Sequence, residues 1–256
     1  MEKLFIHNRK GQKLAVIIGH SDQQRGLAFV MHGLSGFKEQ EHIKTLADAF
    51  HDKGFSVVRF DTTNTFGESD GKYEDATVTN YYEDLEDIIN WASGQGWYQE
   101  PFALAGHSLG GICVILYAEK YPEKVKGLAP ISTVVSGRLS METDKHKSVA
   151  EEWERTGWDV EMGHGGRVKR LKWSHMEDRL KYDVLPDAGK LTMPLLLIVG
   201  EHDTSTPPQH QKILYDALPG KKEMHIIKGS PHTFRDENHL REVKTLLNTW
   251  IEKYLI

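Results

Sequence analysis

Strand-length apolar runs alternate with helix-like segments along most of the chain. The runs include "GLAFVM", "FSVVRF", "FALA" and "LLLIVG", each far too short to cross a bilayer. Between them, apolar residues recur at helical spacing, as in "HIKTLADAF" and "YYEDLEDIINWA". Alternating strands and helices build a mostly parallel sheet with helices on both faces. The sequence therefore predicts an α/β fold, and the strand runs indicate eight strands.

One segment interrupts this alternation. From Val135 to about Lys190 the chain carries three tryptophans and many charged residues, and we find no convincing strand there. We interpret the segment as a mainly helical insertion above the carboxyl edge of the sheet. At 256 residues, one domain is favoured over two. The predicted organisation is a single domain, 1–256, with a small helical cap at about 135–190.

Composition narrows the classes of partner. The net charge is −5, with acidic and basic residues mixed, so no basic stripe points to nucleic acid. The first residues, "MEKLFIHNRKGQK", lack the apolar centre of a signal peptide. Cys113 is the single cysteine, which precludes an internal disulfide and fits a reducing compartment. We expect a cytoplasmic protein without a membrane partner; its oligomeric state is not predicted.

A Gly-x-Ser-x-Gly motif lies where a strand run gives way to a helix. The residues are Gly106-His107-Ser108-Leu109-Gly110, after "FALA" and before "GICVILYAEK". The five-residue match alone is weak, and Ser108 could be an ordinary serine in a tight turn. The strand before it and the helix after it are typical of a nucleophile elbow, in which the turn lifts the serine hydroxyl clear of the backbone. Ser108 is therefore the candidate nucleophile.

A serine nucleophile needs a base, and the base needs an orienting carboxylate. Asp203 follows the strand run "LLLIVG", and His232 follows the run "MHII". The order Ser108, Asp203, His232 is the chain order expected of this architecture. Other acids and bases lie nearby in the sequence but fit the triad positions less well. They are Glu201 and His202 beside Asp203, His225 inside a strand run, and His107 inside the elbow.

The same chemistry needs donors for the developing oxyanion. We expect the backbone N–H of Leu109, which follows the nucleophile, and that of Leu34 in "HGLSG". Gly33 would let the backbone come close, and His32 is expected to fix this loop by a hydrogen bond. No His-Glu-x-x-His motif or cysteine pair is present, so we expect no metal and no cofactor.

Several segments together resemble the α/β-hydrolase superfamily over nearly the whole chain. They are "VMHGLSGFKEQ", "LAGHSLGG", "LLIVGEHDTSTPP" and "KGSPHTF", and they are most similar to the bacterial feruloyl/cinnamoyl esterase and monoacylglycerol-lipase-like branch. The resemblance implies a catalytic triad of Ser108, Asp203 and His232, with an oxyanion hole at the amides of Leu34 and Leu109. It also implies a small cap between the sixth and seventh strands of the sheet.

One loop departs from the pattern of that branch. The usual Asp-x-x-Gly-x-Gly-x-Ser is here Asp61-Thr-Thr-Asn-Thr-Phe-Gly-Glu-Ser69, without the first glycine and one residue longer. Asn64 is expected to take a left-handed conformation in place of that glycine.

These features predict a serine carboxylic ester hydrolase that works through an acyl-enzyme. The expected substrates are small-molecule esters with small to medium acyl or aryl (hydroxycinnamoyl-type) groups. The polar cap and a mean hydropathy of −0.51 argue against a lipase, which needs a broad apolar entrance. The alternatives are a thioesterase or peptidase on the same triad, or a non-catalytic α/β-hydrolase-like binding protein.

Overall fold

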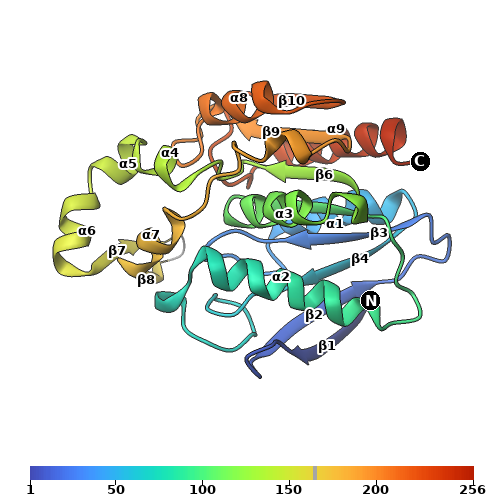
Figure 1. Cartoon of the computed structure of the whole chain (residues 1–256), viewed down its shortest axis with the longest axis horizontal. Helices are drawn as coiled ribbons and strands as arrows, with labels where there is room; N and C mark the ends of the chain where they lie inside the picture. The colour runs from blue at the N-terminus through green and yellow to red at the C-terminus, as the bar shows by residue number, and fades with distance from the viewer. Residues whose placement is uncertain (164–165) are drawn as a thin grey trace.

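The centre of the molecule is an eight-stranded sheet in the order β1-β2-β4-β3-β5-β6-β9-β10 (Figure 1). The structure, a computed structural model, describes residues 1–163 and 166–256. Within this sheet β2 pairs antiparallel with β1 and β4, and all other neighbours pair in parallel. The strands are Glu2–His7 (β1), Lys13–Gly19 (β2), Gly26–Met31 (β3), Phe55–Phe60 (β4), Phe102–His107 (β5), Val125–Ile131 (β6), Leu195–Gly200 (β9) and Lys222–Ile227 (β10). The predicted α/β fold with a mostly parallel eight-stranded sheet is confirmed.

Helices cover both faces of the sheet. The helices α1 (Glu41–Asp52) and α9 (Glu237–Tyr254) pack on one face, and α2 (Val78–Ser93), α3 (Leu109–Lys120) and α8 (Pro208–Ala217) pack on the other. Short 3-10 turns lie at Tyr73–Asp75 (η1), Pro122–Lys124 (η2) and Ala188–Lys190 (η4). Within the described residues, no helix combines the length and the apolar composition needed to cross a bilayer.

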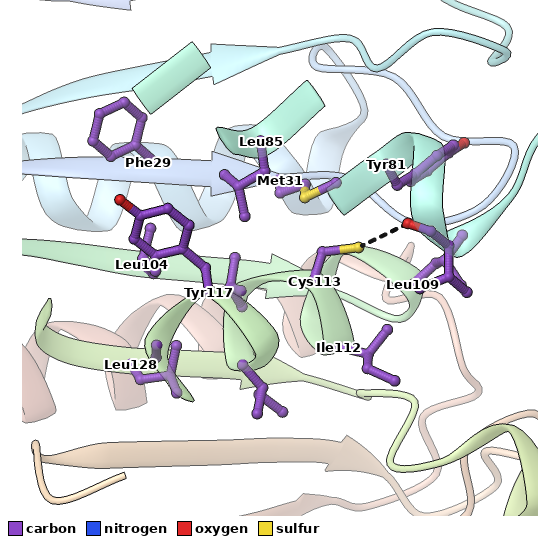
Figure 2. Packing of buried hydrophobic residues seen from close by; sticks show 14 of the residues in the cluster. Phe29, Met31, Tyr81, Leu85, Leu104, Leu109, Ile112, Cys113, Tyr117 and Leu128 are labelled. Atoms are coloured by element: carbon purple, nitrogen blue, oxygen red, sulfur yellow. Dashed lines mark hydrogen bonds between the residues drawn. The ribbon is translucent and has the colours of Figure 1, made fainter. Parts of the chain in front are cut away.

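Figure 2 shows the core between the sheet and the helices α2 and α3. Phe29 and Met31 of β3 face Leu85 of α2, and Tyr117 of α3 packs in the same layer. Cys113 lies fully buried among them, with its Sγ 4.0 Å from the carbonyl oxygen of Val78. Burial raises the pKa of the Cys113 thiol well above its ordinary value. The cysteine is therefore a small core residue.

The insertion between β6 and β9 lies beyond the carboxyl ends of the strands, at the left of Figure 1. Its elements are α4 (Gly137–Met141), α5 (Asp144–Lys147), α6 (Ala150–Thr156), β7 (Trp158–Met162), β8 (Val168–Lys172) and α7 (Ser174–Arg179). The strands β7 and β8 pair antiparallel, so the prediction of a segment without strands was wrong. They are absent from the sequence pattern because they pair only with each other and fully bury only Leu171, which leaves no apolar run.

The hairpin β7–β8 is held to the rest of the insertion by aromatic packing. Trp153 of α6 is buried and donates a hydrogen bond from Nε1 to the carbonyl oxygen of Leu171, at 3.1 Å. Its ring meets that of Trp173 edge to face, with centroids 5.4 Å apart. These tryptophans, which follow no helical or strand period in the sequence, form the small core of the cap.

Candidate active site

Ser108 lies at the junction of β5 and α3 in a strained backbone conformation, with φ at +55°. The flanking glycines are required by close contact. A Cβ on Gly106 would lie 2.4 Å from the carbonyl oxygen of Gly110, and a Cβ on Gly110 would lie 2.4 Å from that of His32. The Ser108 N–H donates to the carbonyl oxygen of Ile131, at 3.0 Å. The sharp turn expected from the motif is therefore present, and strain of this kind is typical of functional positions.

The structure brings Ser108, His232 and Asp203 into one hydrogen-bonded chain. His232 follows β10, and its Nε2 lies 2.9 Å from the Ser108 Oγ. Asp203 follows β9, and its Oδ2 lies 2.8 Å from the His232 Nδ1. The Asp203 side chain is fully buried, whereas that of His232 is 22% exposed. In such an arrangement the imidazole can take the hydroxyl proton during attack on a carbonyl.

The environment of Asp203 favours the ionised carboxylate. Burial by itself raises the pKa of this carboxyl, but the hydrogen bond from His232 and those from Thr206 outweigh it, so the pKa lies well below its usual range. The Thr206 hydroxyl lies 2.9 Å from Oδ2 and 2.9 Å from the carbonyl oxygen of Ser132, which share its one proton, and the N–H groups of Ser205 and Thr206 donate to Oδ1 at 2.9 and 2.8 Å. The sequence analysis missed Thr206, although an aspartate followed by Thr-Ser-Thr is typical of a turn closed on its own side chain.

The other candidate acids and bases lie elsewhere or do other work. Glu201 and His202 are exposed, and the Glu201 carboxylate accepts a hydrogen bond from the N–H of Gly229. His225 lies on the edge strand β10. His107 is buried, with its Nε2 3.0 Å from the carbonyl oxygen of His232. Burial lowers the pKa of His107 to about 3, so its neutral ring positions the backbone of His232.

The loop after β3 lies against Ser108. A Cβ on Gly33 would lie 2.9 Å from the Cβ of Ser108, which explains the glycine. The His32 ring is buried, with Nδ1 2.8 Å from the Gly33 carbonyl oxygen, and its Nε2 accepts the Thr62 N–H at 3.1 Å. Burial lowers the pKa of His32, which fits this neutral, hydrogen-bonded ring. The prediction that His32 fixes the loop is confirmed.

The two amides predicted to bind an oxyanion belong to Leu34 and Leu109, which lie at the cavity that opens over Ser108. Leu34 and Leu109 both line it beside Ser108. Leu109 is the first residue of α3, and an N–H group in the first turn of a helix has no partner within that helix. Both residues thus lie at the cavity, and the binding of an oxyanion by their N–H groups stays a prediction.

The unusual loop after β4 is organised by Asn64. Its φ of +58° is left-handed, as predicted for the position of the missing glycine. The side chain secures the loop, because Oδ1 accepts the N–H of Lys72 at 3.1 Å and Nδ2 donates to the carbonyl oxygen of Asp75 at 3.2 Å. The Ser69 hydroxyl closes the loop by donating to the carbonyl oxygen of Asp61, at 2.7 Å.

A cavity of about 690 Å³ opens over Ser108 and His232. Phe37, Phe66 and Tyr73 contribute aromatic surface. The charged residues of the insertion that line it are Lys145, Glu161, Arg167, Lys169 and Arg179. The sequence analysis missed these charged residues, because they come from separate elements of the cap and share no local motif.

Comparison with known proteins gives relatives that match most of the chain. An uncharacterized 31.7 kDa protein of the traX-finO intergenic region of Escherichia coli is 25% identical, over 96% of this chain and 97% of its own length. The mitochondrial palmitoyl-protein thioesterase ABHD10 of Mus musculus is 27% identical, over 87% of this chain and 72% of its own.

Solved structures match the whole fold. The structure of mouse ABHD10 superposes with a TM-score of 0.81 at 20% identity, covering 99% of each chain. Est1E from Butyrivibrio proteoclasticus, with ferulic acid bound, superposes with a TM-score of 0.79 at 22% identity, covering 98% of this chain and 99% of its own. The family described as serine aminopeptidase, S33 matches residues 22–159, more than half of the chain. The chain therefore belongs to this family and is a hydrolase with the α/β-hydrolase fold.

Proposed function

We propose that this protein is a serine hydrolase that cleaves carboxylic esters through an acyl-enzyme on Ser108. The observation that carries the proposal is the hydrogen-bonded chain from the Ser108 Oγ through His232 to the buried Asp203. Each of these side chains follows a different strand of the sheet. Ser108 and His232 line the cavity and Asp203 is buried behind His232, which is the arrangement that acyl transfer requires.

The proposed reaction has two halves. Ser108 attacks the ester carbonyl while His232 takes its proton, and the tetrahedral intermediate collapses as His232 returns the proton to the leaving alcohol. Water then attacks the acyl-enzyme, with His232 as the base, and releases the acid and the free serine. Asp203 stays ionised throughout and holds the imidazole. The N–H groups of Leu34 and Leu109 would stabilise the oxyanion, and losing one such donor typically costs about 3 kcal/mol.

The cavity supports small to medium acyl or aryl groups. Phe66, Tyr73 and Phe37 contribute aromatic surface to the cavity that an aryl ester can contact, and the Arg167 guanidinium lies over the Phe66 ring, 4.7 Å from its centroid. The ferulic acid bound to Est1E is an aryl acid of this kind. The charged side chains that surround the rest of the cavity would leave a long alkyl chain poorly covered.

A thioester is the second candidate substrate. The relative ABHD10 is named as a palmitoyl-protein thioesterase, and the same nucleophile and base can cleave a thioester. An aminopeptidase activity, which the family description suggests, receives less support. A substrate α-ammonium group would enter a mainly cationic cavity, in which Glu161 is the one carboxylate among the described lining residues.

The test is the turnover of a substrate panel by the wild type and by Ser108→Ala. The panel contains 4-nitrophenyl acetate and butyrate, methyl ferulate, and a butyryl thioester. We expect Ser108→Ala to keep its fold and to lose at least about 10³-fold in kcat on every substrate that the wild type cleaves. Ser93→Ala, an exposed serine at the end of α2, is the matched control and should retain turnover. Wild-type turnover by Ser108→Ala would refute the serine mechanism.

A further inference from the structure

Arg179, the last residue of α7, is a buried cation to which the described residues supply no counter-ion. Its side chain lines the same cavity as Ser108, and the residue is only 6% exposed. Among residues 1–163 and 166–256, no carboxylate lies within 4.0 Å of its guanidinium, and no side-chain hydrogen bond reaches it. The Nε atom is fully buried and unpartnered. Within the described part of the chain, this guanidinium therefore lies at the active-site cavity without an ion-pair partner.

Such an arrangement is costly for the folded protein. A charge that burial strips of part of its hydration, with no ion-pair partner to compensate, destabilises the folded state. Burial lowers the pKa of Arg179 to about 10, so the group is still charged at neutral pH. The preceding residue, Asp178, is a carboxylate, but its oxygens accept hydrogen bonds from Thr79 and pair with Lys181. Burial, together with the charge of Arg179, lowers the pKa of His146 to about 3 and that of His175 to about 4, so both rings are neutral.

The surroundings strengthen the positive potential. Arg235 and the cap residues Lys145, Arg167 and Lys169 also line the cavity. Lys145 and Lys169 share one carboxylate, that of Glu161, at 3.8 and 3.7 Å. Positive charge thus gathers above Ser108 on a chain whose net charge is −5. A concave site lined by one sign of charge draws ligands of the opposite sign.

We propose that the substrate cleaved at Ser108 carries an anionic group, a carboxylate or a phosphate, and that Arg179 binds it. This inference rests on the proposed ester hydrolysis and specifies its substrate class. The guanidinium presents a fork of N–H donors that matches two oxygens of either group. Substrate binding supplies the missing counter-ion, which gives a reason for an unpaired buried charge in this cavity.

The kinetic test compares esters that differ by one charge. On the acyl side, 4-nitrophenyl hydrogen succinate is compared with 4-nitrophenyl butyrate, whose methyl replaces the carboxylate. On the leaving-group side, phenyl butyrate is compared with its 4-carboxy and 4-phosphate derivatives, which separates the carboxylate from the phosphate. For each pair the ratio of kcat/KM, charged over neutral, is measured in the wild type and in Arg179→Gln. Comparing the two proteins cancels the intrinsic reactivity of each ester.

For at least one pair, we expect Arg179→Gln to lower the ratio about 10- to 100-fold, the size of a charge-assisted hydrogen-bonded pair. Arg155→Gln is the matched control, because it removes the same charge from an exposed residue of α6 that pairs with Glu152. It should leave the ratios within about twofold of wild type. Ratios that Arg179→Gln leaves unchanged for all pairs would overturn the proposal. They would leave the serine mechanism standing, since neutral esters would still be cleaved.

A second readout does not depend on turnover. Arg179→Met fills nearly the same space without charge, so it should raise the Tm of the protein without added ligand. Succinate and phenyl phosphate should raise the Tm of the wild type, and at the same concentration should leave that of Arg179→Met unchanged. An equal shift in both proteins, or none in the wild type, would contradict anion binding by Arg179.

Discussion

Ser108, with its positive φ, joins the end of β5 to the start of α3, and the contacts around it leave no room for side chains on the two flanking glycines. Gly106 and Gly110 are set by backbone atoms 2.4 Å from where a Cβ would lie. Such a motif is readable from the sequence because its constraints are local. The proximity of Asp203 and His232 is also predictable, since each follows a parallel strand and the carboxyl ends of those strands meet at one edge.

Thr206 and Arg179 were not predictable in this way. Thr206 has a recognisable turn but an ordinary residue type, and its role depends on a carboxylate that it meets only in three dimensions. Arg179 belongs to an irregular segment, and its unpaired state depends on the positions of α7 and its neighbours. The roles of such residues depend on neighbours that are distant in the sequence, so no local motif or spacing predicts them.

Thr206 is expected to be a positioning residue for the proposed triad. Thr206→Val keeps the shape and the backbone N–H bond to Asp203 but removes the hydroxyl that donates to the carboxylate. We expect kcat on 4-nitrophenyl butyrate to fall about 10-fold with KM unchanged, the effect of one hydrogen bond to a charged group. Thr206→Ser should restore kcat. Failure of the serine variant to restore it, in a protein of wild-type Tm, would argue for a packing role.

The elements divide by how they are stabilised. Strands such as β3 and β9 are buried along their whole length and appear in the sequence as continuous apolar runs. Helices such as α1 keep one buried stripe, and their periodicity predicts them equally well. The hairpin β7–β8 has neither signal, because its strands fully bury only Leu171 and pack on each other and on Trp153. This is the element that brings Arg167 and Lys169 to the cavity, whereas Lys145 and Arg179 come from α5 and α7.

For the whole molecule, burial of neutral imidazoles links stability to pH. Burial lowers the pKa values of His32, His42, His107, His146 and His175 below the ordinary value of 6.5. Between about pH 4 and 6.5 the unfolded chain therefore binds more protons than the folded one, and stability rises with pH in that window. Above it the contribution is fully present, and it is lost as the pH falls.

We expect the free energy of unfolding to fall by at least about 3 kcal/mol between pH 7 and pH 5, as measured by urea denaturation. His175→Gln removes one of these groups and should make the dependence on pH shallower. Equal stability at pH 7 and pH 5 would show that the buried rings are protonated at no cost.

The central claim is that Ser108 is a nucleophile activated by His232. The most direct measurement is labelling of the native protein with a fluorophosphonate, followed by peptide mapping. The account predicts one adduct per chain, on Ser108, and no such adduct in His232→Ala over the same time. Absence of labelling in the wild type, as in a protein that only binds ligands, would contradict it. So would an adduct on another residue with Ser108 unmodified.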